Sequence, residues 1–342
     1  MATRSATNSS SQSRFRFWTN SGTGDIDIIL VHGPGGGPEA TWTHHNGSAW
    51  PRDMLGSRFK GARIMSFLYQ PKFEDFFVIE DGKDLTMERI DKLSGELCRA
   101  FSDLRGSETG KPLLFIAHCL GGLVCANILA KGTVQGCPSQ LAFSKDIARS
   151  CAGIIFLATP FIGEKDPEGW ETIIKKLCIN VRAEVHPGSG PILVQQHFQT
   201  FLQSNLSHLK VDIISEDGDE DLPNIIVTDE YTQIETASLV SFEADHLSIS
   251  KFADEGDSIF KYILGSLRKI MQELNQTNYS PGPSKINYHG PSKSNYRDSS
   301  KVTYRGPIIA MAEHKPISYP QAPGMGPVRI VGARDVKKSG TE

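Results

Sequence analysis

The segment around Cys119 constrains the fold more than any other part of the chain. Residues 112–116 (P-L-L-F-I) form an apolar run with the length and composition of a buried parallel strand. Residues 120–130 have the composition and spacing of a helix. Between them the sequence predicts a sharp turn that lifts the Cys119 side chain above the sheet. The turn places this side chain at a helix N-terminus, where backbone N–H groups favour negative charge.

Small residues flank Cys119 at the positions where bulk would clash in so tight a turn: Ala117, Gly121 and Gly122. Two interpretations of the thiol follow. Cys119 is either a nucleophile raised above a sheet or a buried structural cysteine, since free cysteine is among the most buried residue types. The rest of the chain favours the nucleophile.

Apolar strand-like runs alternate with helical periods along most of the chain. We expect strands at residues 25–32, 62–69, 112–116, 151–157, 211–215 and 237–242, helices at 84–104, 120–130 and 258–274, and a largely helical insertion at 164–208. This alternation predicts an α/β fold with a mostly parallel, doubly wound sheet and helices on both faces. Functional loops gather at the carboxyl ends of such strands. His32, Cys119, Glu216 and His246 all lie at or just beyond a predicted strand end.

Composition narrows the class of protein. The net charge of −3 does not favour binding to nucleic acid or to an acidic membrane surface. The six cysteines have no C-x-x-C or metal-ligand spacing, so they indicate reduced thiols in an intracellular protein, and we expect neither a metal nor another cofactor. No apolar run reaches the ~18 residues that would span a bilayer. Residues 1–24 predict a flexible start, with a weak similarity to a mitochondrial transit peptide.

Four short segments carry a resemblance to a known family, in order between about residues 25 and 270. They are V-H-G-P-G-G at 31–36, followed by T-W-T at 41–43 and W-P-R-D-M-L at 50–55; F-I-A-H-C-L-G-G at 115–122; G-I-I-F-L-A-T-P at 153–160; and A-D-H at 244–246, followed by K-F-A at 251–253. With them the chain resembles α/β-hydrolases of the lipase/esterase group, which includes serine-active-site-containing and GPI-inositol-deacylase-like proteins. Cys119 stands where the nucleophile elbow normally has serine. The resemblance covers residues 25–275.

The resemblance implies a catalytic triad in the chain order nucleophile, acid, histidine. Cys119 takes the nucleophile position and His246 the position of the general base. Glu216, directly after the strand at 211–215, matches the acid. Asp217 and Asp219 are close rivals in the acid-rich segment S-E-D-G-D-E-D, which could also be a solvated loop. A thiolate stabilised by the helix N-terminus and an imidazolium would attack an ester or thioester carbonyl and form a thioester intermediate.

The expected oxyanion hole departs from the family pattern. One backbone N–H should come from Leu120, the residue after the nucleophile. The other normally comes from the residue that follows H-G in the first loop, which here is Pro34 and has no N–H. Gly35 substitutes if the glycine-rich loop shifts. Cysteine and proline together make a catalytically weak or inactive scaffold, acting as a signalling or interaction module, the alternative to an active hydrolase.

Residues 276–342 have a different composition from the predicted domain. They are rich in Ser, Pro, Gly, Asn, Lys and Tyr and contain an eight-residue repeat, G-P-S-K-I-N-Y-H, G-P-S-K-S-N-Y-R and D-S-S-K-V-T-Y-R, at 282–305. This composition predicts a disordered tail or linker. The regular Asn-Tyr pairs suit a protein partner. Related fungal hydrolase domains are N-terminal effectors of NOD-like receptors, which implies a role in immune or incompatibility signalling.

The sequence therefore predicts a cytoplasmic hydrolase, with mitochondrial association as an alternative. We expect an ester or lipid substrate and no specific nucleic acid. The insertion at 164–208 would form the lid or acyl pocket, and peripheral membrane contact would suit a lipid substrate. The residues do not specify an acyl chain length or a head group.

Overall fold

The computed structural model describes residues 14–19, 24–76, 79–80, 83–106, 108, 110–132, 143–162, 167–177, 190–205, 209–217, 225–229, 232, 234 and 237–276. The predicted tail with its eight-residue repeat and the rival acid Asp219 lie outside these residues. The described helices and strands all lie in a compact unit that spans residues 1–285.

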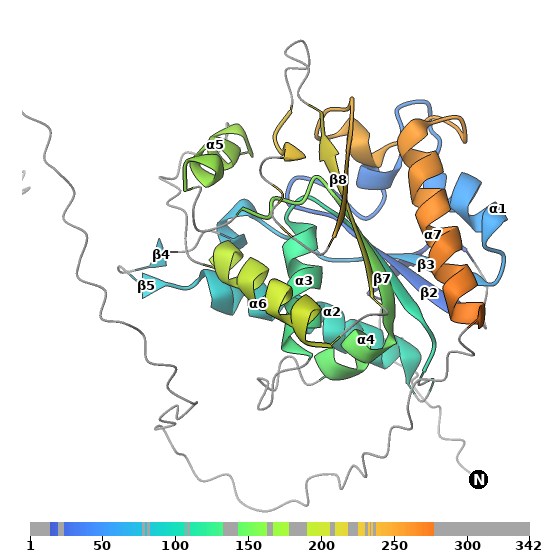
Figure 1. Ribbon diagram of the computed structural model, residues 1–342, viewed down its shortest axis with the longest axis horizontal. Coiled ribbons are helices and arrows are strands. Elements are labelled where there is room, and N and C mark those ends of the chain that lie inside the picture. Colours follow the sequence, from blue (N-terminus) through green and yellow to red (C-terminus); the bar gives the residue numbers. More distant parts are fainter. Residues whose placement is uncertain are drawn as a thin grey trace, which may run out of the picture. The chain divides into compact units, whose positions relative to one another are not determined.

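A seven-stranded sheet forms the centre of this unit (Figure 1). The strands are β1 (Phe15–Phe17), β2 (Ile26–Val31), β3 (Ala62–Phe67), β6 (Leu113–His118), β7 (Cys151–Leu157), β8 (Lys210–Glu216) and β9 (Ser238–Phe242). Their order is β1-β3-β2-β6-β7-β8-β9, and every pair is parallel except β1 with β3. The prediction of a mostly parallel sheet is confirmed, because each predicted strand is present at or near its expected residues.

The inner strands are buried along their whole length. Every residue of β2, β3, β6 and β7 is buried, as expected for parallel strands that are covered on both faces. In contrast, β9 lies at the edge of the sheet and is partly exposed. The continuous apolar runs seen in the sequence are therefore the centre of the sheet.

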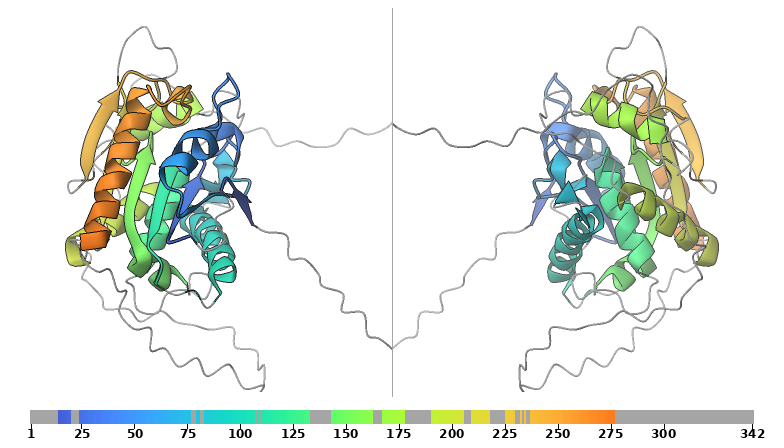
Figure 2. Two further views of the ribbon diagram at one scale, coloured as in Figure 1. Left: turned by 90° about the vertical axis from the view of Figure 1, so that its right-hand side faces the viewer. Right: turned by 90° about the vertical axis from the view of Figure 1, so that its left-hand side faces the viewer.

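Helices cover both faces of the sheet (Figures 1 and 2). On one face α3 (Gly121–Lys131) packs against α2 (Thr86–Arg105), α4 (Ser144–Ser150) and α6 (Gly190–Asn205). On the other face α7 (Ser258–Gln276) packs against β7. All residues of α3 except its last, Lys131, are buried, which agrees with its apolar composition. The predicted insertion contributes α5 (Pro167–Leu177) and α6.

Short elements complete the described part of the chain. They are the 3₁₀ turns η1 (Ala40–Trp42), η3 (Phe73–Phe76) and η6 (Ser248–Ser250), the π-helical turn η2 (Pro51–Leu55), the helical turn α1 (Gly56–Arg58) and the two-stranded pair β4 (Ile79–Glu80) and β5 (Lys83–Asp84).

The N-terminal boundary differs from the expectation of a flexible segment over residues 1–24. Within that segment, Phe15 and Phe17 lie in β1 and pair with Phe67 and Met65 of β3. Trp18 is buried and its indole N–H donates to Ser66. Residues of this segment therefore belong to the sheet, and the sequence did not show it because a three-residue strand is too short to give a periodic signal.

Charged side chains form a buried cluster at the amino end of β2. Asp27 is fully buried and accepts hydrogen bonds from Arg63 (Nε–Oδ1 2.7 Å, Nη2–Oδ2 3.0 Å). Arg105 of α2 donates to the same carboxylate (Nε–Oδ2 3.0 Å). One carboxylate thus links β2, β3 and α2 at the end of the sheet opposite to Cys119.

Candidate functional site

The turn at Cys119 has the strained geometry of a nucleophile elbow. Cys119 has φ of 55°, a left-handed conformation that is uncommon for a residue with a side chain. Its N–H donates to the Leu157 carbonyl (2.9 Å), and its own carbonyl accepts from Thr159 Oγ1 (3.0 Å) and the Gly122 N–H (3.0 Å). These bonds hold the turn against a strain on the order of 1–3 kcal/mol. The predicted sharp turn between β6 and α3 is confirmed.

Glycine is required where the elbow meets its neighbours. A Cβ at Gly121 would lie 2.5 Å from the His32 carbonyl oxygen, and one at Gly122 would lie 2.1 Å from Thr159 Oγ1. A Cβ at Gly33 would lie 2.7 Å from Cys119 Cβ and 3.1 Å from Sγ. The first loop therefore passes directly beside the thiol, and α3 begins in close contact with both β2 and the end of β7.

His246 and Glu216 form a buried pair at the carboxyl end of the sheet. Glu216 is the last residue of β8, and His246 lies in the loop after β9. His246 Nδ1 and Glu216 Oε1 are 2.5 Å apart, and both side chains are almost fully buried. Glu216 Oε2 also accepts the Ile226 N–H. The structure thus brings together the two residues that the sequence assigned as base and acid.

Burial has opposite effects on the two members of this pair, because it disfavours the charged form of each. Desolvation raises the pKa of Glu216 to about 8, although hydrogen bonds from the backbone at Ile226 and Val227 oppose the rise. Desolvation lowers the pKa of His246 to about 4. The His246 imidazole is therefore neutral at neutral pH, and the protonation of Glu216 decides which of its ring nitrogens carries the hydrogen.

The loop that carries His246 is fixed from several sides. The His246 carbonyl accepts from His118 Nε2 (2.8 Å), and burial lowers the pKa of His118 to about 3, so that this ring stays neutral. The Asp245 carboxylate accepts the N–H groups of Leu247 (2.8 Å) and Ser248 (2.7 Å). Trp50 donates to the Ser250 carbonyl (2.9 Å).

The remaining segments of the resemblance pack beneath the same loop. Trp50 contacts Trp42 and Phe252, with ring centroids 6.0 Å and 5.0 Å apart. Ser250 Oγ donates to the Thr41 carbonyl (3.0 Å). The segments around residues 41–43, 50–55 and 251–253 are therefore structural supports for the position of His246.

The nucleophile and the base are not hydrogen-bonded in this structure. His246 Nε2 is buried and has no hydrogen-bond partner. Cys119 is 2% exposed. Of the rival acids, Asp217 is exposed and its backbone N–H donates to the Phe242 carbonyl (2.7 Å), so that Glu216 is the acid partner of His246 among the described residues.

The first loop places the expected oxyanion residues beside Cys119. The Gly36 N–H donates to the Gly33 carbonyl (3.3 Å), and Gly35 has φ of 73°, which makes Gly33–Gly36 a type II turn with Pro34 at its second position. Pro34 is buried and has no N–H, whereas Gly35 is exposed. Leu120 is the N-cap of α3, and its nitrogen would lie 3.2 Å from a Cβ at Gly33.

Sequence reasoning missed three residues that support the site. Thr159 holds the Cys119 carbonyl, and the signal for it was its place in the A-T-P that ends β7. Tyr69 is buried and donates to the His32 carbonyl. Ile226 supports Glu216 through its backbone N–H, which leaves no signature in the sequence. His32, which was predicted to lie at a strand end, contacts the Gly33 carbonyl through Nδ1 (2.9 Å).

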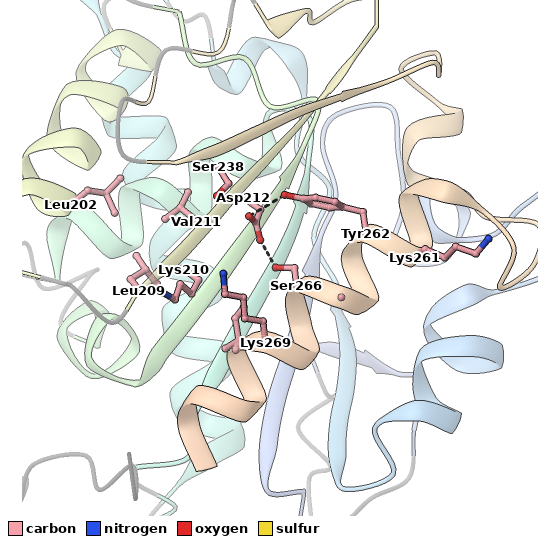
Figure 3. Close-up of a pocket in the computed structure, with 12 residues that line it drawn as sticks. Leu202, Leu209, Lys210, Val211, Asp212, Ser238, Lys261, Tyr262, Ser266 and Lys269 are labelled. Atoms are coloured by element: carbon pink, nitrogen blue, oxygen red, sulfur yellow. Dashed lines mark hydrogen bonds between the residues drawn. The ribbon is translucent and has the colours of Figure 1, made fainter. Parts of the chain in front are cut away.

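A separate groove of about 640 Å³ lies toward the other end of β8 (Figure 3). Asp212 of β8 accepts from Tyr262 (3.3 Å) and Ser266 of α7, and Lys210, Lys261 and Lys269 line the groove. No histidine or cysteine is among its lining residues. The groove therefore lacks the nucleophile and base that the predicted chemistry needs.

Two further properties bear on the predicted class of protein. Among the described residues, no group of three or more His, Cys, Asp or Glu side chains is arranged to hold a metal ion. None of the described helices is both long and apolar enough to cross a membrane.

No family model matches this chain, and no curated protein matches it significantly. Several solved structures are similar to it over most of their length. A carboxylesterase structure from the thaumarchaeon Nitrososphaera gargenis is 13% identical, covers 76% of this chain and 95% of its own, and has a TM-score of 0.41. MenH from S. aureus is 11% identical, with coverages of 76% and 99% and a TM-score of 0.41. Esterase B from Lactobacillus rhamnosis is 14% identical, with coverages of 75% and 80% and a TM-score of 0.40.

Similarity at this level carries no argument about activity. The sheet order, the elbow after β6 and the helices on both faces define an α/β-hydrolase fold, as the sequence predicted. The chemistry has to be argued from the residues of the site.

Proposed function

We propose that this protein hydrolyses carboxylic esters or thioesters through Cys119, His246 and Glu216. The observation that carries the proposal is the buried 2.5 Å contact between His246 Nδ1 and Glu216 Oε1, at the edge of the sheet where the elbow raises Cys119. Burying two titratable groups is costly unless they are paired. A buried acid–histidine pair beside a strained cysteine elbow is what nucleophilic catalysis needs.

In the first half-reaction, His246 Nε2 takes the proton of the Cys119 thiol, and Sγ attacks the substrate carbonyl carbon. A C–S bond forms as the electron pair of the C=O bond moves to oxygen. The tetrahedral oxyanion then collapses and expels the alkoxide or thiolate leaving group, which takes the proton from His246. Glu216 holds the imidazole and stabilises its cation. The product of this half is a thioester on Cys119.

In the second half-reaction, water gives a proton to His246, and its oxygen attacks the thioester carbonyl carbon. Collapse of the second tetrahedral oxyanion breaks the C–S bond. Cys119 leaves as a thiolate and takes the proton back from His246, and the carboxylic acid is released. The sum is ester plus water to acid plus alcohol, with the protein unchanged.

The oxyanion would be stabilised by the Leu120 N–H at the start of α3, next to the close approach of Gly33 to the elbow. Because Pro34 has no N–H, a second donor would have to come from Gly35 after a shift of the turn. Loss of one such donor costs about 10²–10³ in turnover in studied hydrolases. We therefore expect modest turnover.

The test is covalent modification of the purified protein, read by intact mass over a range of pH. One reagent is a fluorophosphonate and the other is a thiol-directed acyl electrophile. Stoichiometric modification of Cys119 that is lost in His246→Ala supports the proposal, and Cys119→Ala removes the modified residue. Modification that is absent, or independent of His246 in folded protein, contradicts it.

The alternative is a hydrolase scaffold with little or no turnover that acts as a signalling or interaction module. Three observations favour it: the orphaned Nε2 of His246, the 2% exposure of Cys119 and the proline in the oxyanion loop. Under this alternative Cys119→Ser keeps the protein inert toward fluorophosphonate. A Cys119→Ser variant that gains His246-dependent labelling instead identifies a site built for an oxygen nucleophile.

The substrate class is proposed from the surroundings of His246. Leu247 follows the base and is 59% exposed, so an apolar acyl group that enters beside His246 would contact an apolar side chain. We therefore place lipid esters ahead of small polar esters. We expect faster turnover of medium-chain than of acetyl p-nitrophenyl esters. Leu247→Ser should abolish this preference.

A further inference from the structure

Lys176 of α5 contacts the segment that supports the acid. Trp170 and Ile173 are buried, and Lys176 follows on the same face of the helix because residues three apart lie in one row. The Lys176 ammonium donates to the Ile225 carbonyl at 2.7 Å. A residue of the predicted insertion thus reaches the loop beside β8.

The Ile225 carbonyl and the Ile226 N–H are the two ends of one peptide group. The N–H end donates to Glu216 Oε2, and the other Glu216 oxygen contacts His246 Nδ1. The chain of contacts is therefore ammonium, peptide, carboxylate, imidazole. Hydrogen bonds in such a chain polarise one another, so that a cation on the carbonyl strengthens the N–H as a donor. The loop is held in register by the Glu216 N–H, which donates to the Val227 carbonyl (3.0 Å).

We propose that Lys176 is a positioning residue that acts through the 225–226 peptide group to favour the ionised form of Glu216 and to direct this carboxylate at His246. The proposal deepens the proposed hydrolase function and rests on it for its catalytic meaning. It assigns a part of the acid's environment to the insertion, which otherwise would contribute only the substrate pocket.

The charges that face Glu216 come from three elements. Asp245, in the loop after β9, raises the pKa of Glu216, whereas Lys176 on α5 and the two backbone N–H groups lower it. His246 is neutral at neutral pH. Lys176 is therefore the cation that opposes the burial of this carboxylate, and its removal should shift ionisation of Glu216 to higher pH.

The experiment follows the titration of the His246 ring in the full-length protein by ¹⁵N NMR of imidazole-labelled samples, with His246→Gln used for assignment. Ionisation of Glu216 moves the ring hydrogen to Nδ1, which changes both nitrogen shifts. In Lys176→Met we expect the midpoint to rise by about half a pH unit or more, because one favourable charge is lost. Lys176→Arg keeps the donor and should restore the midpoint.

The matched control is Lys210→Met, which removes the same charge at the first residue of β8, where Lys210 pairs with Glu273 (3.3 Å). A midpoint that moves in Lys176→Met but not in Lys210→Met or Lys176→Arg supports the proposal. Equal midpoints in both methionine variants, or equal shifts in Lys176→Met and Lys176→Arg, overturn it. Far-UV circular dichroism checks that each variant is folded.

The same samples separate failure of this inference from failure of the proposed function. The NMR midpoint does not require turnover, so it tests Lys176 even in an inactive protein. Where Cys119 is labelled in a His246-dependent manner, Lys176→Met should slow labelling at pH 7 by about threefold, the rate that half a pH unit predicts. If Lys176→Met changes neither the labelling rate of Cys119 nor the NMR midpoint, the role of Lys176 is wrong and the proposed hydrolase function is unaffected.

Discussion

At the scale of single residues, the site depends on which nitrogen of His246 carries a hydrogen. While Glu216 is protonated, its O–H donates to Nδ1, and the ring hydrogen sits on Nε2, which then cannot accept a proton from Cys119. Once Glu216 ionises, Nδ1 carries the hydrogen and Nε2 has a free lone pair. The raised pKa of Glu216 therefore makes the base competent only on the alkaline side.

We accordingly predict that the rate of Cys119 acylation rises with pH through a midpoint near the Glu216 pKa of about 8. A free thiol also ionises in this range, so Glu216→Gln is the necessary comparison. It should lower the rate by about a hundredfold or more at pH 9. An unchanged profile in Glu216→Gln would mean that the thiol alone sets the pH dependence.

Gly33 provides the second residue-scale prediction. The backbone at Gly33 approaches the elbow so closely that a Cβ there would lie 2.7 Å from Cys119 Cβ, 3.1 Å from Sγ and 3.2 Å from the Leu120 nitrogen. Gly33→Ala should reduce acylation by about a hundredfold, because the carbonyl oxygen would lose its place against the N–H donor. Gly37→Ala, whose Cβ would meet only Ala40 at 3.8 Å, should remain active. Equal rates in the two variants would place the oxyanion elsewhere.

At the scale of elements, the elbow is a joint between three of them. Thr159 beyond β7 packs against Gly122 of α3 and donates to the carbonyl of Cys119, the residue after β6. The joint allows Cys119 to keep a left-handed backbone without help from a ligand. The conformation of the elbow is therefore stabilised by the contact between the end of β7 and α3, in addition to the hydrogen bonds within the turn.

Thr159→Val removes the hydroxyl and keeps the shape of the side chain. The Cys119 carbonyl retains only the Gly122 N–H, and we expect a loss of about 1 kcal/mol in the free energy of unfolding. For a domain of this size that lowers the melting temperature by about 2–4 °C, measured by calorimetry. Thr200→Val removes a comparable bond to the Gln196 carbonyl on the exposed face of α6 and should have little effect. A larger change in Thr200→Val would contradict this account.

At the scale of the whole domain, one end of the sheet holds the residues of the candidate site and the other end holds a buried charged cluster. The carboxyl end holds the candidate site, and the amino end holds the Asp27 cluster that joins β2, β3 and α2. Stability and chemistry should therefore respond to different substitutions.

Asp27→Asn removes the buried carboxylate charge that pairs with Arg63 and Arg105, and Arg63 keeps only a longer contact with the exposed Glu108 (3.8 Å). We expect a loss of about 3–5 kcal/mol in the free energy of unfolding, measured with urea, and unchanged labelling of Cys119 per folded molecule. Glu255→Gln, which breaks an exposed pair with Arg58, should cost less than about 1 kcal/mol. Similar losses in both variants would mean that the buried cluster is not a special source of stability.

The sequence predicted those parts of the fold and site that have a side-chain signature. Apolar runs located the inner strands, and the small residues around Cys119 located the elbow. The family resemblance placed Glu216 first as the partner of His246 and left Asp217 and Asp219 as rivals, between which the sequence alone could not decide. Contacts made by backbone groups, such as the Ile226 N–H, could not be predicted because they do not depend on the type of side chain. The unpartnered state of His246 Nε2 could not be predicted either, since it depends on how the folded loops are placed, which has no pattern in the sequence.

Lys176 lies at the surface, and the 225–226 peptide group connects it to Glu216, so that the solvent around Lys176 can influence the ionisation of a buried carboxylate. The lysine is exposed, so mobile ions screen its charge, whereas Glu216 and His246 are shielded from them. Ionic strength should therefore shift the pH at which the site becomes competent, even though no ion reaches it. Acetylation of the Lys176 amine would remove its charge completely, so it should raise the pH at which Glu216 ionises by more than added salt does.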